Sequence, residues 1–96
     1  MDKKYVIEKL YATRNYISKE YGVSSLILFG SYATDEQTEN SDIDVCVEME
    51  PNLYNRIGLK NYLEEYMQLP VDVVRKNKNM DPFFSTQIDK HGIIVF

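Results

Sequence analysis

Hydrophobic residues recur at helical spacing in two long segments of the chain. Between residues 2 and 21, apolar side chains fall three or four positions apart, which predicts an amphipathic helix that Gly22 ends. The same spacing follows Pro51 and stops at Pro70, and it predicts a second helix even though Gly58 lies inside it. Both helices should pack one apolar side against a common core.

The rest of the chain reads as a third helix and four short strands. Asp81 is a suitable N-cap for a helix over residues 82–91, and Gly92 is a suitable terminator. Short apolar or alternating runs predict strands at 25–29, 42–48, 71–74 and 93–96. This order of elements predicts an α/β or α+β fold, with a sheet of about four strands backed by helices.

Length, charge and cysteine content narrow the class of protein. The chain has 96 residues, which suits one domain over residues 1–96. Its net charge is −4 and it has no dense basic stripe, so we expect no direct binding of duplex nucleic acid. A single cysteine, Cys46, excludes an intrachain disulfide and fits a reducing, cytoplasmic setting. No apolar run is long enough to span a membrane, and we expect no membrane partner.

Three acidic residues occupy strands in which packing alone would favour apolar side chains. Asp42 and Asp44 alternate with apolar residues, so they share one face of their strand, roughly 6.6 Å apart along the backbone. Asp72 lies between two valines of the third predicted strand. Carboxylates on one face repel one another unless a hard cation such as Mg²⁺ neutralises them. The pattern therefore predicts a divalent metal site.

A glycine and a serine leave the first predicted strand. Gly30 allows the backbone to approach a ligand closely, and the N–H groups and hydroxyl that follow, beginning at Ser31, can bind phosphate oxygens. A phosphate cradle beside acids that hold Mg²⁺ is the combination needed for phosphoryl or nucleotidyl transfer.

The spacing Gly-Ser, ten residues, Asp-x-Asp, with Asp72 in a later strand, resembles the signature of the minimal nucleotidyltransferases. These belong to the DNA polymerase β-like nucleotidyltransferase superfamily, and the order of elements matches along nearly the whole chain. The resemblance implies the nucleotidyltransferase fold with a small mixed sheet, and ATP and two Mg²⁺ ions at the site. It also implies that Asp42, Asp44 and Asp72 are the metal-binding and catalytic acids, and that Gly30 and Ser31 hold the triphosphate.

Short members of this family are often antitoxins paired with a HEPN ribonuclease toxin. The resemblance therefore implies transfer of AMP to a hydroxyl of such a toxin, with a tyrosine as the leading acceptor. Two alternatives stay open. One is an antitoxin with a vestigial site that acts by binding alone, and the other is a nucleotidyltransferase that modifies a small molecule.

The chain departs from the family's usual sequence motif just after Gly30 and Ser31. Thr34 and Asp35 stand where an Arg-Gly pair is common, which removes a positive charge and adds a negative one. Arg75 and Lys76 are the nearest cations after Asp72 and are candidates to compensate. His91 directly precedes a glycine near a helix end, where we expect a capping role.

Overall fold

The computed structural model describes all residues from Met1 to Phe96 and shows a mixed α/β fold. One sheet has the strand order β3-β2-β1-β4, in which β2 and β3 are parallel and the other two neighbouring pairs are antiparallel. The predicted four-stranded mixed sheet is therefore confirmed. The elements are α1 (Lys3–Ala12), α2 (Arg14–Tyr21), β1 (Ser25–Phe29), β2 (Ile43–Glu48), α3 (Leu53–Met67), β3 (Val71–Arg75), α4 (Pro82–His91) and β4 (Ile93–Ile94).

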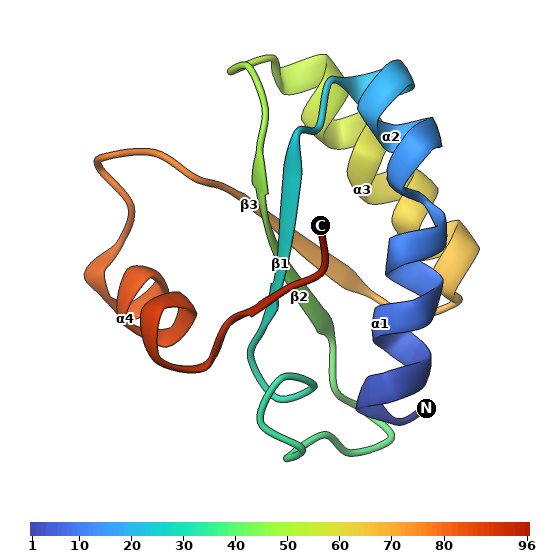
Figure 1. Ribbon diagram of the computed structural model, residues 1–96, viewed down its shortest axis with the longest axis vertical. Coiled ribbons are helices and arrows are strands. Elements are labelled where there is room, and N and C mark those ends of the chain that lie inside the picture. The colour runs from blue at the N-terminus through green and yellow to red at the C-terminus, as the bar shows by residue number, and fades with distance from the viewer.

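The helices lie on both faces of the sheet. Helices α1, α2 and α3 cover one face, and α4 lies alone on the other side (Figure 1). The main hydrophobic core fills the space under the three helices, and its fully buried side chains include Leu10, Ile17, Leu28, Val45 and Leu63. Strand residues that alternate with these core positions therefore face α4. No helix is both long enough and apolar enough to cross a membrane.

The helix predicted over residues 2–21 is two helices, because the chain leaves the α-helical hydrogen-bond pattern at Thr13. The Thr13 hydroxyl is buried and donates a 2.6 Å hydrogen bond to the Leu10 carbonyl, and the Thr13 N–H donates to the same oxygen at 3.0 Å. Bonding three residues back tightens the turn at this point. The backbone resumes as α2, whose Ile17 N–H donates to the Thr13 carbonyl.

Helix α3 begins two residues later than Pro51 suggests. Asn52 is its N-cap, and the Asn52 side chain accepts a hydrogen bond of 3.0 Å from the Asn55 N–H. Gly58 has a packing reason to lie inside this helix: a Cβ there would come within 2.9 Å of Cε1 of Tyr21. The glycine thus allows α2 and α3 to approach closely.

The outer strands differ in length from the prediction, and side chains protect the free edge of β3. Strand β3 extends to Arg75, whereas β4 has only two residues. At the start of β3, the Val71 N–H donates to Glu64 Oε2 at 3.1 Å, and Lys60 Nζ donates to the Val71 carbonyl at 2.9 Å. The Val71 N–H also lowers the pKa of the Glu64 carboxyl. Two α3 side chains thus satisfy the backbone groups that face outward here.

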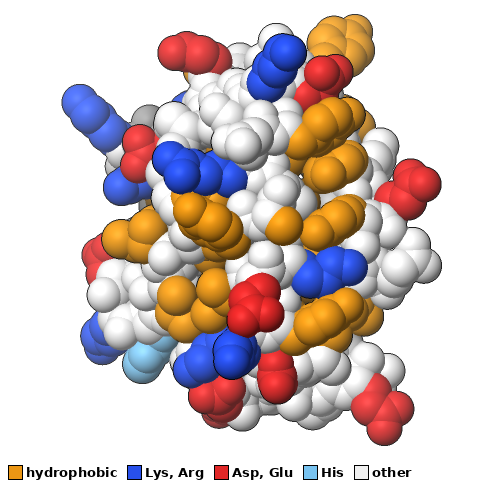
Figure 2. Space-filling view, turned by 45° about the vertical axis from the view of Figure 1, so that its right-hand side comes forward, with side chains coloured by type: hydrophobic (Ala, Val, Ile, Leu, Met, Phe, Trp, Pro, Cys, Tyr) orange, Lys and Arg blue, Asp and Glu red, His pale blue; other side chains and the backbone are white.

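Tyrosines line the seam between α2 and α3. Tyr62 stacks on Tyr16, with ring centroids 4.7 Å apart, and on Tyr66, at 5.9 Å. Lys9 Nζ lies 4.5 Å from the centroid of the Tyr66 ring. Figure 2 shows hydrophobic side chains gathered in a column on this helical side of the molecule, with a cationic side chain between them. Half-exposed rings therefore continue the core outward to the surface.

Candidate active site

The chain makes a single tight turn directly after β1. Gly30 has a φ of +75°, in the region that glycine adopts most readily. The Gly30 carbonyl accepts hydrogen bonds from the N–H groups of Ala33 and Thr34, at 3.1 and 3.3 Å. The backbone N–H groups of Ser31 and Tyr32 precede these donors and make no backbone hydrogen bond. The turn therefore offers free donors of the kind that bind an anion.

This turn lies against Asp44. Strand pairing places Phe29 opposite Asp44, so Gly30 passes over the Asp44 side chain. A Cβ on Gly30 would collide with the Asp44 carboxylate, since even its Cγ would be only 3.0 Å away. Glycine is thus required at this position both by its backbone conformation and by the neighbouring acid.

The predicted acids gather at one end of two adjacent strands. In the parallel pairing of β2 with β3, Asp44 lies directly opposite Asp72. Asp44 is half-buried, whereas Asp72 and Asp42 are exposed, and Asp42 immediately precedes β2. The fold thus brings Gly30, Ser31 and the three predicted acids to the same region of the molecule.

The surroundings of Asp44 disfavour its ionisation. Burial, followed by the negative charges of Asp72 and Asp42, raises the pKa of Asp44 from 3.8 to about 6. No three acids, histidines or cysteines in the structure adopt an arrangement that could hold a metal ion. The oxygen donors present suit a hard cation such as Mg²⁺, whose charge would offset both the burial of Asp44 and the repulsion from its neighbouring acids. That all three acids bind a metal stays a prediction.

A cleft of about 670 Å³ opens beside the Gly30 turn. Its lining residues come from the turn and from α4, and they are Gly30, Ser31, Ala33, Thr34, Glu36, Gln87 and His91. We expected His91 to have a capping role. The capping bond is instead made by the backbone N–H of Gly92 to the Ile88 carbonyl, and the His91 side chain lines the cleft. Gln87 was also overlooked, although its spacing of four residues from His91 places both side chains on one helical face.

The unusual residues after the turn have different surroundings. Thr34 lines the cleft, and its hydroxyl donates a 2.7 Å hydrogen bond to Glu36 Oε1. Asp35 does not line the cleft, and it forms an ion pair of 3.0 Å with Lys3 of α1. The additional negative charge is therefore paired with α1 and lies outside the cleft.

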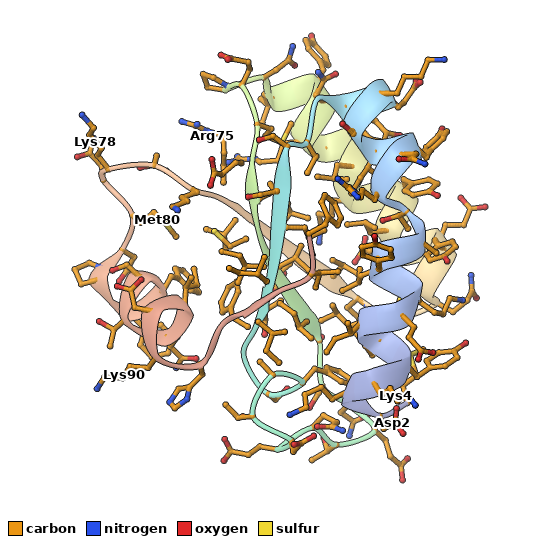
Figure 3. The ribbon with its side chains drawn as sticks, viewed as in Figure 1. Asp2, Lys4, Arg75, Lys78, Met80 and Lys90 are labelled. Carbon is orange, nitrogen blue, oxygen red and sulfur yellow. The ribbon has the colours of Figure 1, made fainter.

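The two cations proposed to compensate lie elsewhere. Arg75 and Lys76 line a separate cleft near the far end of β2, together with Glu48. Lys76 pairs with Glu48 at 3.5 Å, and Arg75 donates to the Met49 carbonyl at 3.3 Å. Figure 3 shows Arg75 and Lys78 at the end of the molecule opposite the turn that follows β1. The suggestion that these cations replace the missing arginine was wrong, because β3 carries them away from Gly30.

The chain matches the family model of the nucleotidyltransferase domain over residues 10–95. A relative from Methanocaldococcus jannaschii, named a protein adenylyltransferase by inference, is 37% identical over 90 residues, and the alignment covers 92% of both chains. The protein adenylyltransferase MntA of Thermococcus cleftensis is 39% identical over 70 residues, which is 71% of each chain.

Solved structures share the fold. The complex of a tri-AMPylated HEPN toxin of Shewanella oneidensis with its MNT antitoxin contains a chain that superposes with a TM-score of 0.64. That match has 19% identity and covers 90% of this chain and 68% of the other. Sequence and fold therefore agree that this chain belongs to the nucleotidyltransferase domain family, among the minimal nucleotidyltransferases whose relatives are protein adenylyltransferases.

Proposed function

We propose that this protein transfers AMP from ATP to a tyrosine hydroxyl of a HEPN-type toxin and so acts as the antitoxin of the pair. The observation that carries the proposal is the Gly30 turn, whose free N–H groups lie beside the paired acids Asp44 and Asp72. The AMPylated toxin in the related complex supports the identity of the partner. A cytoplasmic setting, expected from the single cysteine, is consistent with a reaction that uses ATP.

The turn binds and orients the triphosphate. The N–H groups of Ser31 and Tyr32 donate to phosphate oxygens, and the absence of a side chain on Gly30 lets the phosphates come close to Asp44. Such fixed donors need no reorganisation when charge develops during the reaction. Their role is to hold the α-phosphorus beside the acids.

Asp42, Asp44 and Asp72 would hold Mg²⁺. The family resemblance implies two such ions. Bound Mg²⁺ neutralises phosphate charge and makes the α-phosphorus easier to attack. Asp72 is the exposed member opposite Asp44, so it is the acid that an acceptor from another chain can reach. It takes the proton as the acceptor oxygen bonds to the α-phosphorus, and the α–β phosphoanhydride bond breaks to release pyrophosphate.

The decisive experiment incubates the protein with ATP labelled at the α-phosphate, Mg²⁺ and the product of the neighbouring gene, which we expect to be the HEPN toxin. We expect label on the toxin with the wild type and none with the double variant Asp42→Asn/Asp44→Asn. Asp89→Asn is the matched control, because it removes an exposed carboxylate of α4 outside the site. A tight complex that never becomes labelled would reject transfer and favour an antitoxin that acts by binding alone.

A further inference from the structure

The cleft beside the Gly30 turn has a second wall that the proposed function does not yet use. That wall is α4, which contributes Gln87 and His91. The two residues are one helical turn apart, so their side chains project toward the same space. The opposite wall carries Ser31, whose backbone N–H is free to bind phosphate.

Helix α4 is held in place at both ends. Near its start, the Phe84 ring packs edge-on against Phe29 of β1, with centroids 6.0 Å apart. Just past its end, Gly92 lies so close to Ile27 that a Cβ there would be 2.9 Å from the Ile27 Cγ2 atom. Both contacts are with β1, the strand that leads directly into Gly30. The distance between the two walls of the cleft is therefore set by the sheet.

The composition of the cleft indicates which part of a nucleotide it receives. Ala33 is the only hydrophobic lining residue, so the cleft has no large apolar or aromatic side chain against which a purine ring could pack. Its remaining side chains are polar, and one of them, Glu36, would repel phosphate. His91 is the only lining residue that can carry a positive charge, and it faces the turn from the opposite wall. Such a cleft favours a polyphosphate over a nucleoside.

The position of the acids indicates which phosphates these are. Transfer of AMP requires the α-phosphorus to lie beside Asp44 and Asp72, whereas none of the three acids lines the cleft. The cleft begins at Gly30 and extends away from them toward α4. Phosphates that continue past Gly30 into this space are those that leave as pyrophosphate.

We propose that Gln87 and His91 form a subsite that binds the pyrophosphate portion of ATP. The inference rests on the proposed function for the position of the α-phosphorus. The Gln87 amide and the His91 imidazole donate hydrogen bonds to the departing phosphates, on which negative charge develops as the α–β bond breaks. They are positioning residues that replace the arginine common after the turn in the family.

Calorimetry with three probes tests the subsite: ATP, AMP and inorganic pyrophosphate, each with Mg²⁺. We expect His91→Ala and Gln87→Leu each to weaken binding of ATP and pyrophosphate by about tenfold, the effect of losing one charge-assisted hydrogen bond. Binding of AMP should be unchanged. His91→Gln, which keeps an N–H donor, should recover part of the loss.

Lys90→Ala is the matched control, because it removes a cation from the neighbouring position without altering the cleft. Lys90 points away from the turn in Figure 3 and does not line the cleft. We expect its affinities to stay within about twofold of the wild type, since exposed charges at a distance are screened. Equal melting temperatures for all variants would show that the losses are not due to unfolding.

The binding and labelling experiments distinguish failure of the subsite from failure of the proposed AMP transfer. If the variants bind ATP and pyrophosphate as the wild type does, or if AMP weakens as much as ATP, the subsite is wrong, whatever the protein transfers. A wild type that does not bind pyrophosphate at all also rejects it. If pyrophosphate binding follows the pattern above but no label reaches the toxin, the subsite stands and the proposed function fails.

Discussion

Replacing Asp44 with asparagine should stabilise the protein when no divalent metal is present. Burial and the charges of Asp72 and Asp42 raise the Asp44 pKa from 3.8 to about 6, which corresponds to at most about 3 kcal/mol at neutral pH. Because Asp44 is only half-buried, water screens much of this, and we expect a gain on the order of 1 kcal/mol. In a domain of this size, that gain raises the melting temperature by about 4–8 °C.

The stability gained by Asp44→Asn should depend on pH. The folded state binds the Asp44 proton more tightly than the unfolded state does, so wild-type stability falls as the pH rises from 3.8 to about 6. Above this range the penalty is complete, and below it the penalty vanishes. The advantage of Asp44→Asn should therefore be full at pH 7.5 and close to zero near pH 3.5.

Thermal denaturation followed by circular dichroism in chelator measures the effect at both pH values. Asp89→Asn removes a carboxylate of α4 that is exposed and lies outside the site, and it should melt like the wild type at each pH. Added Mg²⁺ should raise the melting temperature of the wild type more than that of Asp44→Asn. If Asp44→Asn melts below the wild type at pH 7.5 in chelator, the Asp44 carboxylate stabilises the fold and the electrostatic reasoning is wrong.

Three further substitutions test other parts of the site. Gly30→Ala should abolish detectable ATP binding and cost about 1–3 kcal/mol in denaturant unfolding, because the methyl group requires a strained φ and meets the Asp44 carboxylate; wild-type affinity would show that the turn is not the phosphate site. Asp35→Ala should leave ATP affinity unchanged in calorimetry and change stability by less than about 1 kcal/mol, because its exposed pair with Lys3 lies outside the cleft; tighter ATP binding would show that its charge reaches the site. Asp72→Asn should bind Mg-ATP within a few-fold of the wild type but transfer label about 10²–10⁴ times more slowly in single-turnover assays; transfer at the wild-type rate would remove Asp72 from the mechanism.

The sequence was most informative at positions where the residue type conflicts with packing. Acids within apolar strands have no simple packing explanation, so the alternation predicted that Asp42 and Asp44 share one face and singled out Asp72 in a later strand. The sequence did not predict that Asp44 and Asp72 face each other. The strand register then placed these two side chains opposite each other. A glycine at the end of a strand was equally informative, and the collision that a Cβ at Gly30 would suffer explains its presence.

Contacts between distant segments could not be predicted from periodicity. His91 lies about sixty residues from the Gly30 turn, and only the packing of α4 on β1 brings the two together. Arg75 appeared close to the site because it follows Asp72 by three residues, but an extended strand carries it roughly 10 Å away. The break at Thr13 was also hidden, since its cause is one buried hydroxyl that competes with the helical hydrogen bonds.

The side chains that cover the start of β3 affect how this protein behaves among other proteins. An outer strand with free N–H and C=O groups can recruit strands from other chains, which leads to aggregation or amyloid. Glu64 and Lys60 occupy both outward-facing groups of Val71, and the Asn77 amide donates to the Arg75 carbonyl at 3.0 Å near the other end. Only the middle of the strand, around Val73, remains open to such pairing. The covered ends thus limit pairing of β3 with other chains, while Asp72 on the same strand keeps its side chain exposed.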